Sequence, residues 1–404
     1  MPRSSTHPSL RPLPASGPGP APDWAERAQG VADALVPDAA ARDRAGASPR
    51  RELALLREAG LLELLYPAGL GGGGGSFTDA LTAVRIIGRA DTSIAQLLAY
   101  HYLHLTNALW RADAEQAATL TRAAVAGRWF WGGASNPRDP ESVLTPDGDG
   151  FRLDGRKTFA SNAALADRIT LRARLGDGFA VIVVPGDRAG VSHGNDWDAF
   201  GQRLSESGTI TFAGVRIAAD EVLGDPAAPP PARTSLVVPF HQLTIVNFYL
   251  GTAEGALAEA GRYIRDISRP WQASGVAEAR LDPYILEHFG DLDVELRASL
   301  ALADVAGARF EAATALGNAI TGDERNLAAA AIYAAKVHAT RTALEVASKI
   351  FELMGARATA GALGYDRYWR NIRTHTLHDP VAYKSREVGN FALNGTITPT
   401  PLYS

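Results

Sequence analysis

Cysteine is absent from the 404-residue sequence, and this absence removes several kinds of chemistry at once. The chain can form no disulfide bond, and it has no thiolate nucleophile and no cysteine-ligated metal site. A chain without disulfides is compatible with a reducing compartment, so we expect a cytoplasmic location. Long apolar runs are missing too, because no stretch approaches the roughly eighteen uninterrupted apolar residues of a membrane-spanning helix.

An excess of one charge is also missing, since 40 Lys and Arg residues are interspersed with 44 Asp and Glu residues. This balance predicts neither nucleic acid nor an anionic membrane as a partner. The chain is longer than one ordinary hydrophobic core can serve, which indicates two or three packed regions. Residues 1–22 are rich in Pro and Ser and contain no apolar signal-peptide segment, so we expect a disordered tail there.

The segment 23–126 has the apolar spacing of helices. In the phrase "RRELALLREAGLLELLYP", leucines recur at helix-like intervals until Pro67, which predicts a helix that continues to that proline. The glycine run 71–75 could suggest a phosphate cradle. No Lys-Ser or Lys-Thr pair follows it, so a flexible loop is the better interpretation.

The segment 127–232 instead contains short β-branched and aromatic runs such as "GFAVIVVP". Ile210 and Phe212 alternate with threonines, as in an antiparallel strand with one buried face. No helix-length segment separates the runs, so we predict a compact antiparallel β domain rather than a doubly wound parallel sheet. Three Asp-Gly pairs predict tight hairpin turns: Asp147-Gly148, Asp149-Gly150 and Asp154-Gly155.

Residues 233–404 return to helical periodicity, with long helices expected at roughly 243–267, 283–317 and 323–354. Thr321 and Glu324 have the spacing of a capping box at the start of the third helix. Long Ala-rich helices joined by short turns build a bundle. The expected fold class is therefore α+β, with a helical domain, a β domain and a helical bundle in that order.

The phrase "RTHTLHDPVAYK" near the C-terminus places two histidines three residues apart, His375 and His378, before Asp379 and Pro380. On a helix this spacing puts both imidazoles on one face. A metal site, an acid–base device and a plain helix end are all compatible with it. A metal site is disfavoured, since adjacent helical residues point in different directions and no further His or Glu cluster completes a ligand set.

Several longer phrases resemble the acyl-CoA dehydrogenase superfamily, among them "GRKTFASNA", "FGQRLSESGTITFAGVRI" and "FELMGARATAGALGYDRYWRN". The phrases "SRPW", "DPYILEHFGDL" and "RTHTLHDPVAYK" add a finer resemblance to its reduced-flavin-dependent monooxygenases, typified by dibenzothiophene monooxygenase. The resemblance implies an N-terminal helical domain, a central antiparallel β domain and a C-terminal four-helix bundle.

The same resemblance implies the oxygenase half of a two-component system. Reduced FMN, or FAD, would come from a separate NAD(P)H-dependent reductase and react with dioxygen to a flavin C4a-hydroperoxide. The substrate would be an aromatic, heteroaromatic or sulfur- or nitrogen-containing small molecule. The implied assembly is a homotetramer.

The resemblance also assigns roles to individual residues. It implies that His378 handles protons beside the flavin, that Ser161 lies near the oxygen adduct and that Tyr100 faces the substrate. His375 is better interpreted as structural. The flavin-binding residues that it implies are Trp131, Gly133, Ser135, Asn136, Ser161, Trp197, Arg269 from a neighbouring subunit, Arg357, His378 and Asp379.

Three positions depart from the family patterns. Asp379 stands where acyl-CoA dehydrogenases carry a catalytic glutamate, and a dehydrogenase using this shorter carboxylate as its base is the alternative function. Dibenzothiophene-oxidising members have asparagine where we align Gly133 and histidine where we align Gln96. The amide of Asn136 could replace the lost asparagine if its loop bends inward. A flavin-free scaffold of the same fold is a further alternative.

Overall fold

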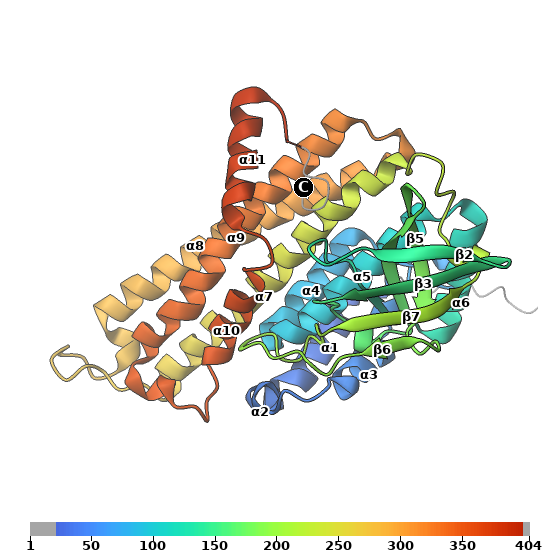
Figure 1. Cartoon of the computed structure of the whole chain (residues 1–404). Helices are drawn as coiled ribbons and strands as arrows, with labels where there is room; N and C mark the ends of the chain where they lie inside the picture. The colour runs from blue at the N-terminus through green and yellow to red at the C-terminus, as the bar shows by residue number, and fades with distance from the viewer. Residues whose placement is uncertain (1–21, 399–404) are drawn as a thin grey trace, which may run out of the picture.

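The protein is described by a computed structural model over residues 22–398, so residues 1–21 of the expected tail lie outside the described part. A helical region, a β domain and a second helical region follow one another along the chain (Figure 1). The predicted fold class is confirmed. No helix within residues 22–398 combines the length and the apolar character needed to cross a membrane.

The N-terminal region is built from helices of seven to twenty residues. One long helix up to Pro67 was expected, but α3 ends at Glu58 because Gly60 adopts a left-handed backbone with φ of 71°. The helices are α1 (Trp24–Leu35), α2 (Ala39–Ala45), α3 (Arg50–Glu58), α4 (Phe77–Ala90), α5 (Thr92–Arg111) and α6 (Ala114–Gly127).

The β domain is one curled sheet with the order β1-β4-β2-β3-β7-β6, and β5 pairs with β4. Four pairings are antiparallel, as expected, but β4 runs parallel to both β1 and β2. The strands are β1 (Trp131–Gly133), β2 (Ser142–Asp147), β3 (Gly150–Lys157), β4 (Arg168–Leu175), β5 (Gly178–Pro185), β6 (Val191–His193) and β7 (Ile210–Ile217).

The Asp-Gly pairs divide between turn and strand. Gly148, with φ of 64°, makes the hairpin turn between β2 and β3, as predicted. The predicted turn at Asp154-Gly155 is wrong, because this pair lies inside β3 at a shift of register against β7. A Cβ atom at Gly155 would come within 2.5 Å of the Ser142 hydroxyl, so glycine serves close strand packing there.

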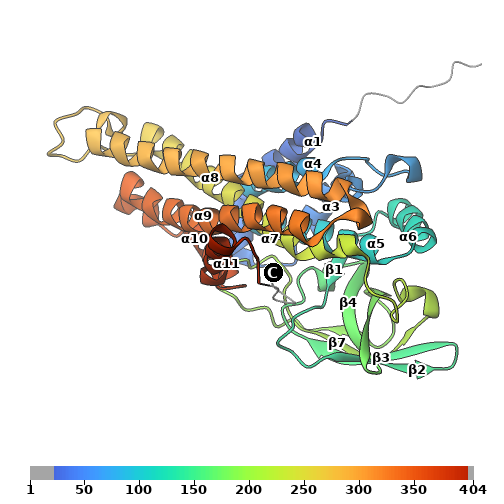
Figure 2. The same ribbon diagram turned by 90° about the horizontal axis from the view of Figure 1, so that it is seen from above.

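The C-terminal region contains three helices of 30 to 33 residues, α7 (Val237–Asp266), α8 (Pro283–Ala315) and α9 (Gly322–Met354). The predicted capping box of Thr321 and Glu324 is present at the start of α9. Figure 2 shows α7, α8 and α9 running side by side. Two shorter helices complete the region, α10 (Asp366–His375) and α11 (Val381–Asn394).

Helix α5 lies where the three regions meet, since it packs against α4, α7, α10 and the strands β1, β4 and β5. Helix α4 approaches α7 very closely, because Gly251 leaves no space for a side chain: its Cβ would lie 2.1 Å from the carbonyl oxygen of Arg85. This close contact holds the bundle against the N-terminal region. The residues on the inner faces of α5, α7 and α10 are thereby brought together.

Candidate active site

A hydrogen-bonded chain of aromatic side chains connects α5, α10 and α7. The Tyr100 hydroxyl lies 2.9 Å from Nε2 of His375, and the Tyr249 hydroxyl lies 2.8 Å from Nδ1 of the same ring. Burial lowers the pKa of His375 well below its ordinary value, and the nearby His378 and Lys336 lower it further. The ring is therefore neutral, so one tyrosine donates to it and the other accepts from it.

The His378 ring stacks on the His375 ring of this hydrogen-bonded chain. Helix α10 ends at His375, so the two histidines do not share a helix face as their spacing suggested; the turn after the helix stacks their rings instead, 5.5 Å apart and 4° from parallel. The ring of His241, at the start of α7, meets His378 edge-on at 5.0 Å. The His378 side chain is 31% exposed, whereas His375 is buried, so His378 is the histidine of this stacked pair that can exchange protons with solvent.

Asp379 is a buried carboxylate between two lysines. Its oxygens lie 4.0 Å from Nζ of Lys336 and 3.8 Å from Nζ of Lys384, and Oδ1 is 3.3 Å from Nδ1 of His378. Burial opposes ionisation, but the His378 hydrogen bond and the lysine charges outweigh it and hold the pKa of Asp379 well below its usual range. Such a carboxylate is a weak proton acceptor, which disfavours a role as catalytic base.

Lys336 is buried and its ammonium group has no hydrogen-bond partner within the described part of the chain. It lies 4.6 Å from the centre of the Tyr249 ring. Burial lowers its pKa to about 8, with Lys384 acting in the same direction and Asp379 opposing. The Asp379 carboxylate is therefore the group that keeps this lysine charged at neutral pH.

The β domain contributes a row of buried hydroxyl groups. Ser161 Oγ lies 2.7 Å from Ser207 Oγ, which lies 2.8 Å from Ser205 Oγ. Each hydroxyl can donate one hydrogen bond and accept others, so the row fixes the direction in which the Ser161 hydroxyl points.

The aromatic side chains of the β domain differ in how far they are exposed. Phe159, 66% exposed, meets the partly buried Trp197 edge-to-face at 6.0 Å, and the indole N–H of Trp197 donates to the Gln202 carbonyl. Trp131 differs from what we expected. Its side chain is fully buried and donates to the Tyr66 hydroxyl, so it presents no surface to a ligand, and only the backbone at this position remains available.

The loop after β1 positions the other predicted residues. Ser135 is exposed. The Asn136 amide donates to the Thr158 hydroxyl and its oxygen accepts from the Arg138 backbone, so the loop itself engages this side chain, and it does not replace an amide at position 133. The space beside Gly133 is filled by the imidazole of His104.

Arg269 and Arg357 lie at the far end of the bundle, where the Ser268 hydroxyl ties the end of α7 to the Met354 carbonyl of α9. The helical rise from Tyr249 to the end of α7 is about 25 Å, so neither arginine reaches the His378 cluster of its own chain. Both are exposed, and neither has an ion-pair partner within residues 22–398.

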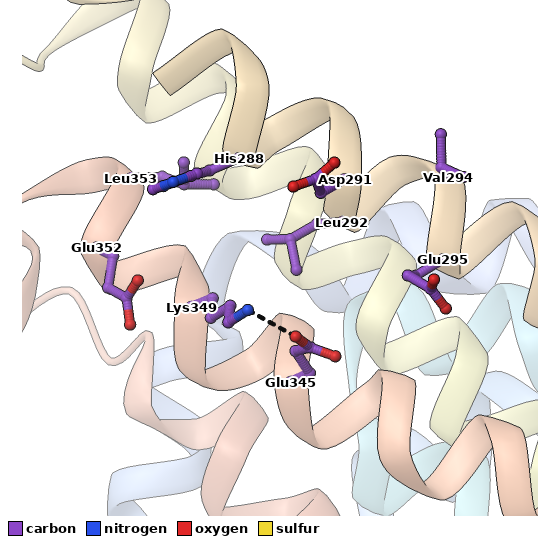
Figure 3. Close-up of a pocket in the computed structure, with 9 residues that line it drawn as sticks. All are labelled: His288, Asp291, Leu292, Val294, Glu295, Glu345, Lys349, Glu352 and Leu353. Atoms are coloured by element: carbon purple, nitrogen blue, oxygen red, sulfur yellow. Dashed lines mark hydrogen bonds and ion pairs between the residues drawn. The ribbon is translucent and has the colours of Figure 1, made fainter. Parts of the chain in front are cut away.

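A surface groove of about 370 Å³ between α8 and α9 lies apart from this cluster (Figure 3). Its polar groups are mainly carboxylates, and Lys349 is paired with Glu345 at 2.6 Å. None of the predicted site residues lines it. Within residues 22–398 no three His, Cys, Asp or Glu side chains are grouped so as to hold a metal ion.

Comparison with known proteins identifies the family. Residues 24–128, 132–215 and 243–382 match the N-terminal, middle and C-terminal domains of acyl-CoA dehydrogenase. A probable FMNH2-dependent monooxygenase, SfnC of Pseudomonas putida, is 37% identical over 93% of this chain and 96% of its own length. The chain belongs to the flavin monooxygenase branch of the acyl-CoA dehydrogenase family.

Two further relatives support this assignment. The dibenzothiophene monooxygenase of Mycolicibacterium goodii is 40% identical over 87% of this chain and 89% of its own. The crystal structure of TdsC from Paenibacillus sp. A11-2 with FMN and indole is 37% identical, covers 94% of this chain and 99% of its own, and superposes with a TM-score of 0.90. This flavin monooxygenase is an oxidoreductase with FMN as its cofactor, and the resemblance found in the motifs is confirmed.

The residues of the monooxygenase fit FMN. A planar aromatic cofactor needs apolar faces, a few hydrogen-bonding groups and cations for its phosphate. The exposed Phe159, its partly buried neighbour Trp197 and the Ser161 hydroxyl offer the first two. Arg269 and Arg357 have no ion-pair partner within residues 22–398, and their guanidinium groups would suit the phosphate of a flavin in a neighbouring subunit.

Sequence reasoning missed three residues of the monooxygenase cluster. His241 stands in "PFHQLTIVN", where its imidazole is the only ionisable side chain and is the local signal that could have identified it. Tyr249 and Lys336 carry no local signal, because each lies in a long apolar helix and its role depends on residues more than forty positions away. His375 is buried, as expected of a structural histidine, and it also connects Tyr100 to Tyr249.

Proposed function

We propose that this monooxygenase is the oxygenase component of a two-component system that receives reduced FMN from a separate NAD(P)H-dependent reductase, with FAD as a second flavin. The relative named as FMNH2-dependent supports this proposal. The observation that carries it is the pairing of a partly exposed His378 with a carboxylate locked between two lysines. The arrangement suits proton handling rather than removal of a proton from a thioester substrate.

The proposed substrate is a small sulfur-containing or heteroaromatic molecule. Relatives named for dibenzothiophene, and a TdsC structure that holds indole, support this class. Tyr100 is the side chain that we assign to placing the substrate, because its hydroxyl is held by His375 while its ring lies 5.1 Å from His241.

The proposed chemistry needs protons delivered in a pocket that excludes water. Bound reduced FMN would supply the two electrons that activate dioxygen, so that one oxygen atom enters the substrate and the other leaves as water. His378 holds the proton and exchanges it with solvent, while Asp379 orients its Nδ1 atom. The Ser161 hydroxyl, which is held by Ser207, would donate a hydrogen bond to the oxygen that FMN activates.

Rapid mixing of the protein and reduced FMN with dioxygen tests this function. We expect an absorbance band of a flavin–oxygen adduct that outlives the same adduct in free solution, since the enclosed site retards its decay to hydrogen peroxide. Anaerobic mixing of the FAD-loaded protein with an acyl-CoA should leave the flavin oxidised. Bleaching of the flavin by acyl-CoA, without an oxygen adduct, would favour the dehydrogenase alternative.

The proposed assembly is a homotetramer in which Arg269 reaches the flavin phosphate of a neighbouring subunit. Its distance from the His378 cluster within one chain supports this arrangement. The outer face of α8 offers a surface for self-association. Val294 and Val305 are 63% and 55% exposed, and with the exposed Ala298 and Ala301 between them they form a stripe at helical spacing.

The double variant Val294→Glu, Val305→Glu should shift the protein to smaller assemblies, because it places charges in this apolar stripe. FMN binding should weaken at least tenfold in parallel, since Arg269 would act between subunits. Sedimentation velocity and FMN titration measure the two effects. Phe179→Glu, an apolar-to-acid change on β5, is the control and should change neither; an unchanged mass for the double variant would contradict the assigned interface.

A further inference from the structure

Helix α5 presents three polar side chains at four-residue intervals, Gln96, Tyr100 and His104. This spacing places them on one face of the helix, and α5 packs against β1. The Tyr100 and His104 rings are 6.2 Å apart and edge-to-face. His104, which the sequence "LLAYHYLHL" would suggest is structural, therefore lines the same cluster as the proposed substrate-placing tyrosine.

The His104 imidazole occupies the space that a side chain at position 133 would need. A Cβ atom added to Gly133 would lie 2.0 Å from Cε1 of His104 and 2.5 Å from each ring nitrogen. Gly133 does not have a left-handed backbone, so conformation does not require glycine there. The glycine is required by the imidazole, and the two residues form a matched pair.

One nitrogen of His104 is fixed and the other is available. Nδ1 lies 3.1 Å from the Thr170 hydroxyl, and Thr170 is the strand partner of Gly133. Nε2 has no hydrogen-bond partner within residues 22–398, and the side chain is partly exposed. Burial lowers the pKa of His104 to about 4, so the ring is neutral at physiological pH. A neutral ring held at Nδ1 offers a single hydrogen-bonding atom.

Building on the proposed oxygenase function, we propose that His104 is a specificity-determining residue, whose Nε2 atom hydrogen-bonds a heteroatom group of the substrate beside Gly133. The favoured substrate is then a small ring compound with an N–H or sulfur-bound oxygen at that end. An otherwise similar all-carbon ring would be disfavoured, because it would leave Nε2 without a partner.

Matched probe pairs test the proposal in the full oxygenase with reduced FMN and dioxygen. Indole and indene differ by an N–H group, and benzothiophene S-oxide and benzothiophene differ by a sulfur-bound oxygen. In at least one of the two pairs, we expect the wild-type kcat/KM to be about tenfold higher for the polar member than for the apolar member. His104→Phe should abolish this preference and change kcat/KM for the apolar member less than threefold. His104→Gln, which keeps a hydrogen-bonding side chain, should retain part of the preference.

The glycine gives an independent test that does not depend on binding by His104. Gly133→Ala should lower activity toward both probe pairs at least tenfold, because its methyl group meets the imidazole. Adding His104→Ala to it should recover activity toward the apolar probes but not the preference for the polar one. Gly389→Ala on α11, where a Cβ meets nothing within 4 Å, is the matched control.

Different outcomes would contradict the proposed function and the role of His104. A wild type that forms no flavin–oxygen adduct and oxygenates none of the probes contradicts the proposed function. A wild type that oxygenates the probes but shows no polar preference, or a preference that His104→Phe leaves unchanged, overturns only the role of His104.

Discussion

Replacing His378 with alanine should lower the rate of substrate oxygenation by about a hundredfold or more, the usual loss when a positioned proton-transfer group is removed. The partly exposed imidazole, stacked on His375 and bonded to Asp379, is the group that we assign to proton delivery. Reduced FMN should still react with dioxygen in the variant. Oxygen consumption should then appear as hydrogen peroxide instead of product, which separate assays of the two measure.

His193→Ala is the matched control for this variant, because His193 lies on β6 in the β domain and hydrogen-bonds the Gly186 carbonyl instead of a residue of the His378 cluster. It should leave the ratio of product to peroxide unchanged. Thermal unfolding of both variants shows whether the fold is retained. Product formation by His378→Ala at close to the wild-type rate would remove His378 from the mechanism.

Replacing Asp379 with asparagine should destabilise the protein by about 3–5 kcal/mol, because it leaves buried lysines without their countercharge. The carboxylate is buried with Lys336 and Lys384 within 4.0 Å. Chemical denaturation at fixed protein concentration measures the difference. The control is Asp304→Asn, which removes an ion pair between Arg85 and a carboxylate that is 65% exposed, and it should cost at most about 1 kcal/mol.

The effect of Asp379 should depend on pH in a defined direction. Its pKa in the folded protein lies below that of an unfolded aspartate, about 3.9. The unfolded chain therefore binds a proton at a higher pH than the folded chain does, so the carboxylate stabilises the fold above about pH 4 and this contribution falls on further acidification. The difference between the wild type and Asp379→Asn should shrink below pH 4, where the unfolded chain takes up the proton; a difference that does not shrink there would contradict the assigned ion pair.

Elements with strong local signals were predictable from the sequence. The long bundle helices and the Thr321 capping box follow from apolar period and cap spacing. Asp154-Gly155 was mistaken for a turn because a glycine that admits a neighbouring strand has the same local signature as a glycine in a hairpin. The leucine spacing continues through Gly60 and so predicts a helix up to Pro67. The left-handed backbone of Gly60 stops the helix before that point.

The sequence by itself determined the order of the three regions, the family and a set of candidate residues that includes His378, Ser161 and Tyr100, because short motifs carry these. Only the tertiary structure decided what surrounds them. Lys336 meets Asp379, His375 joins Tyr100 to Tyr249, and His104 fills the space at Gly133, through contacts between segments far apart in the chain. Burial and charge at such contacts set proton affinities and free space, and these depend on packing that no local pattern contains.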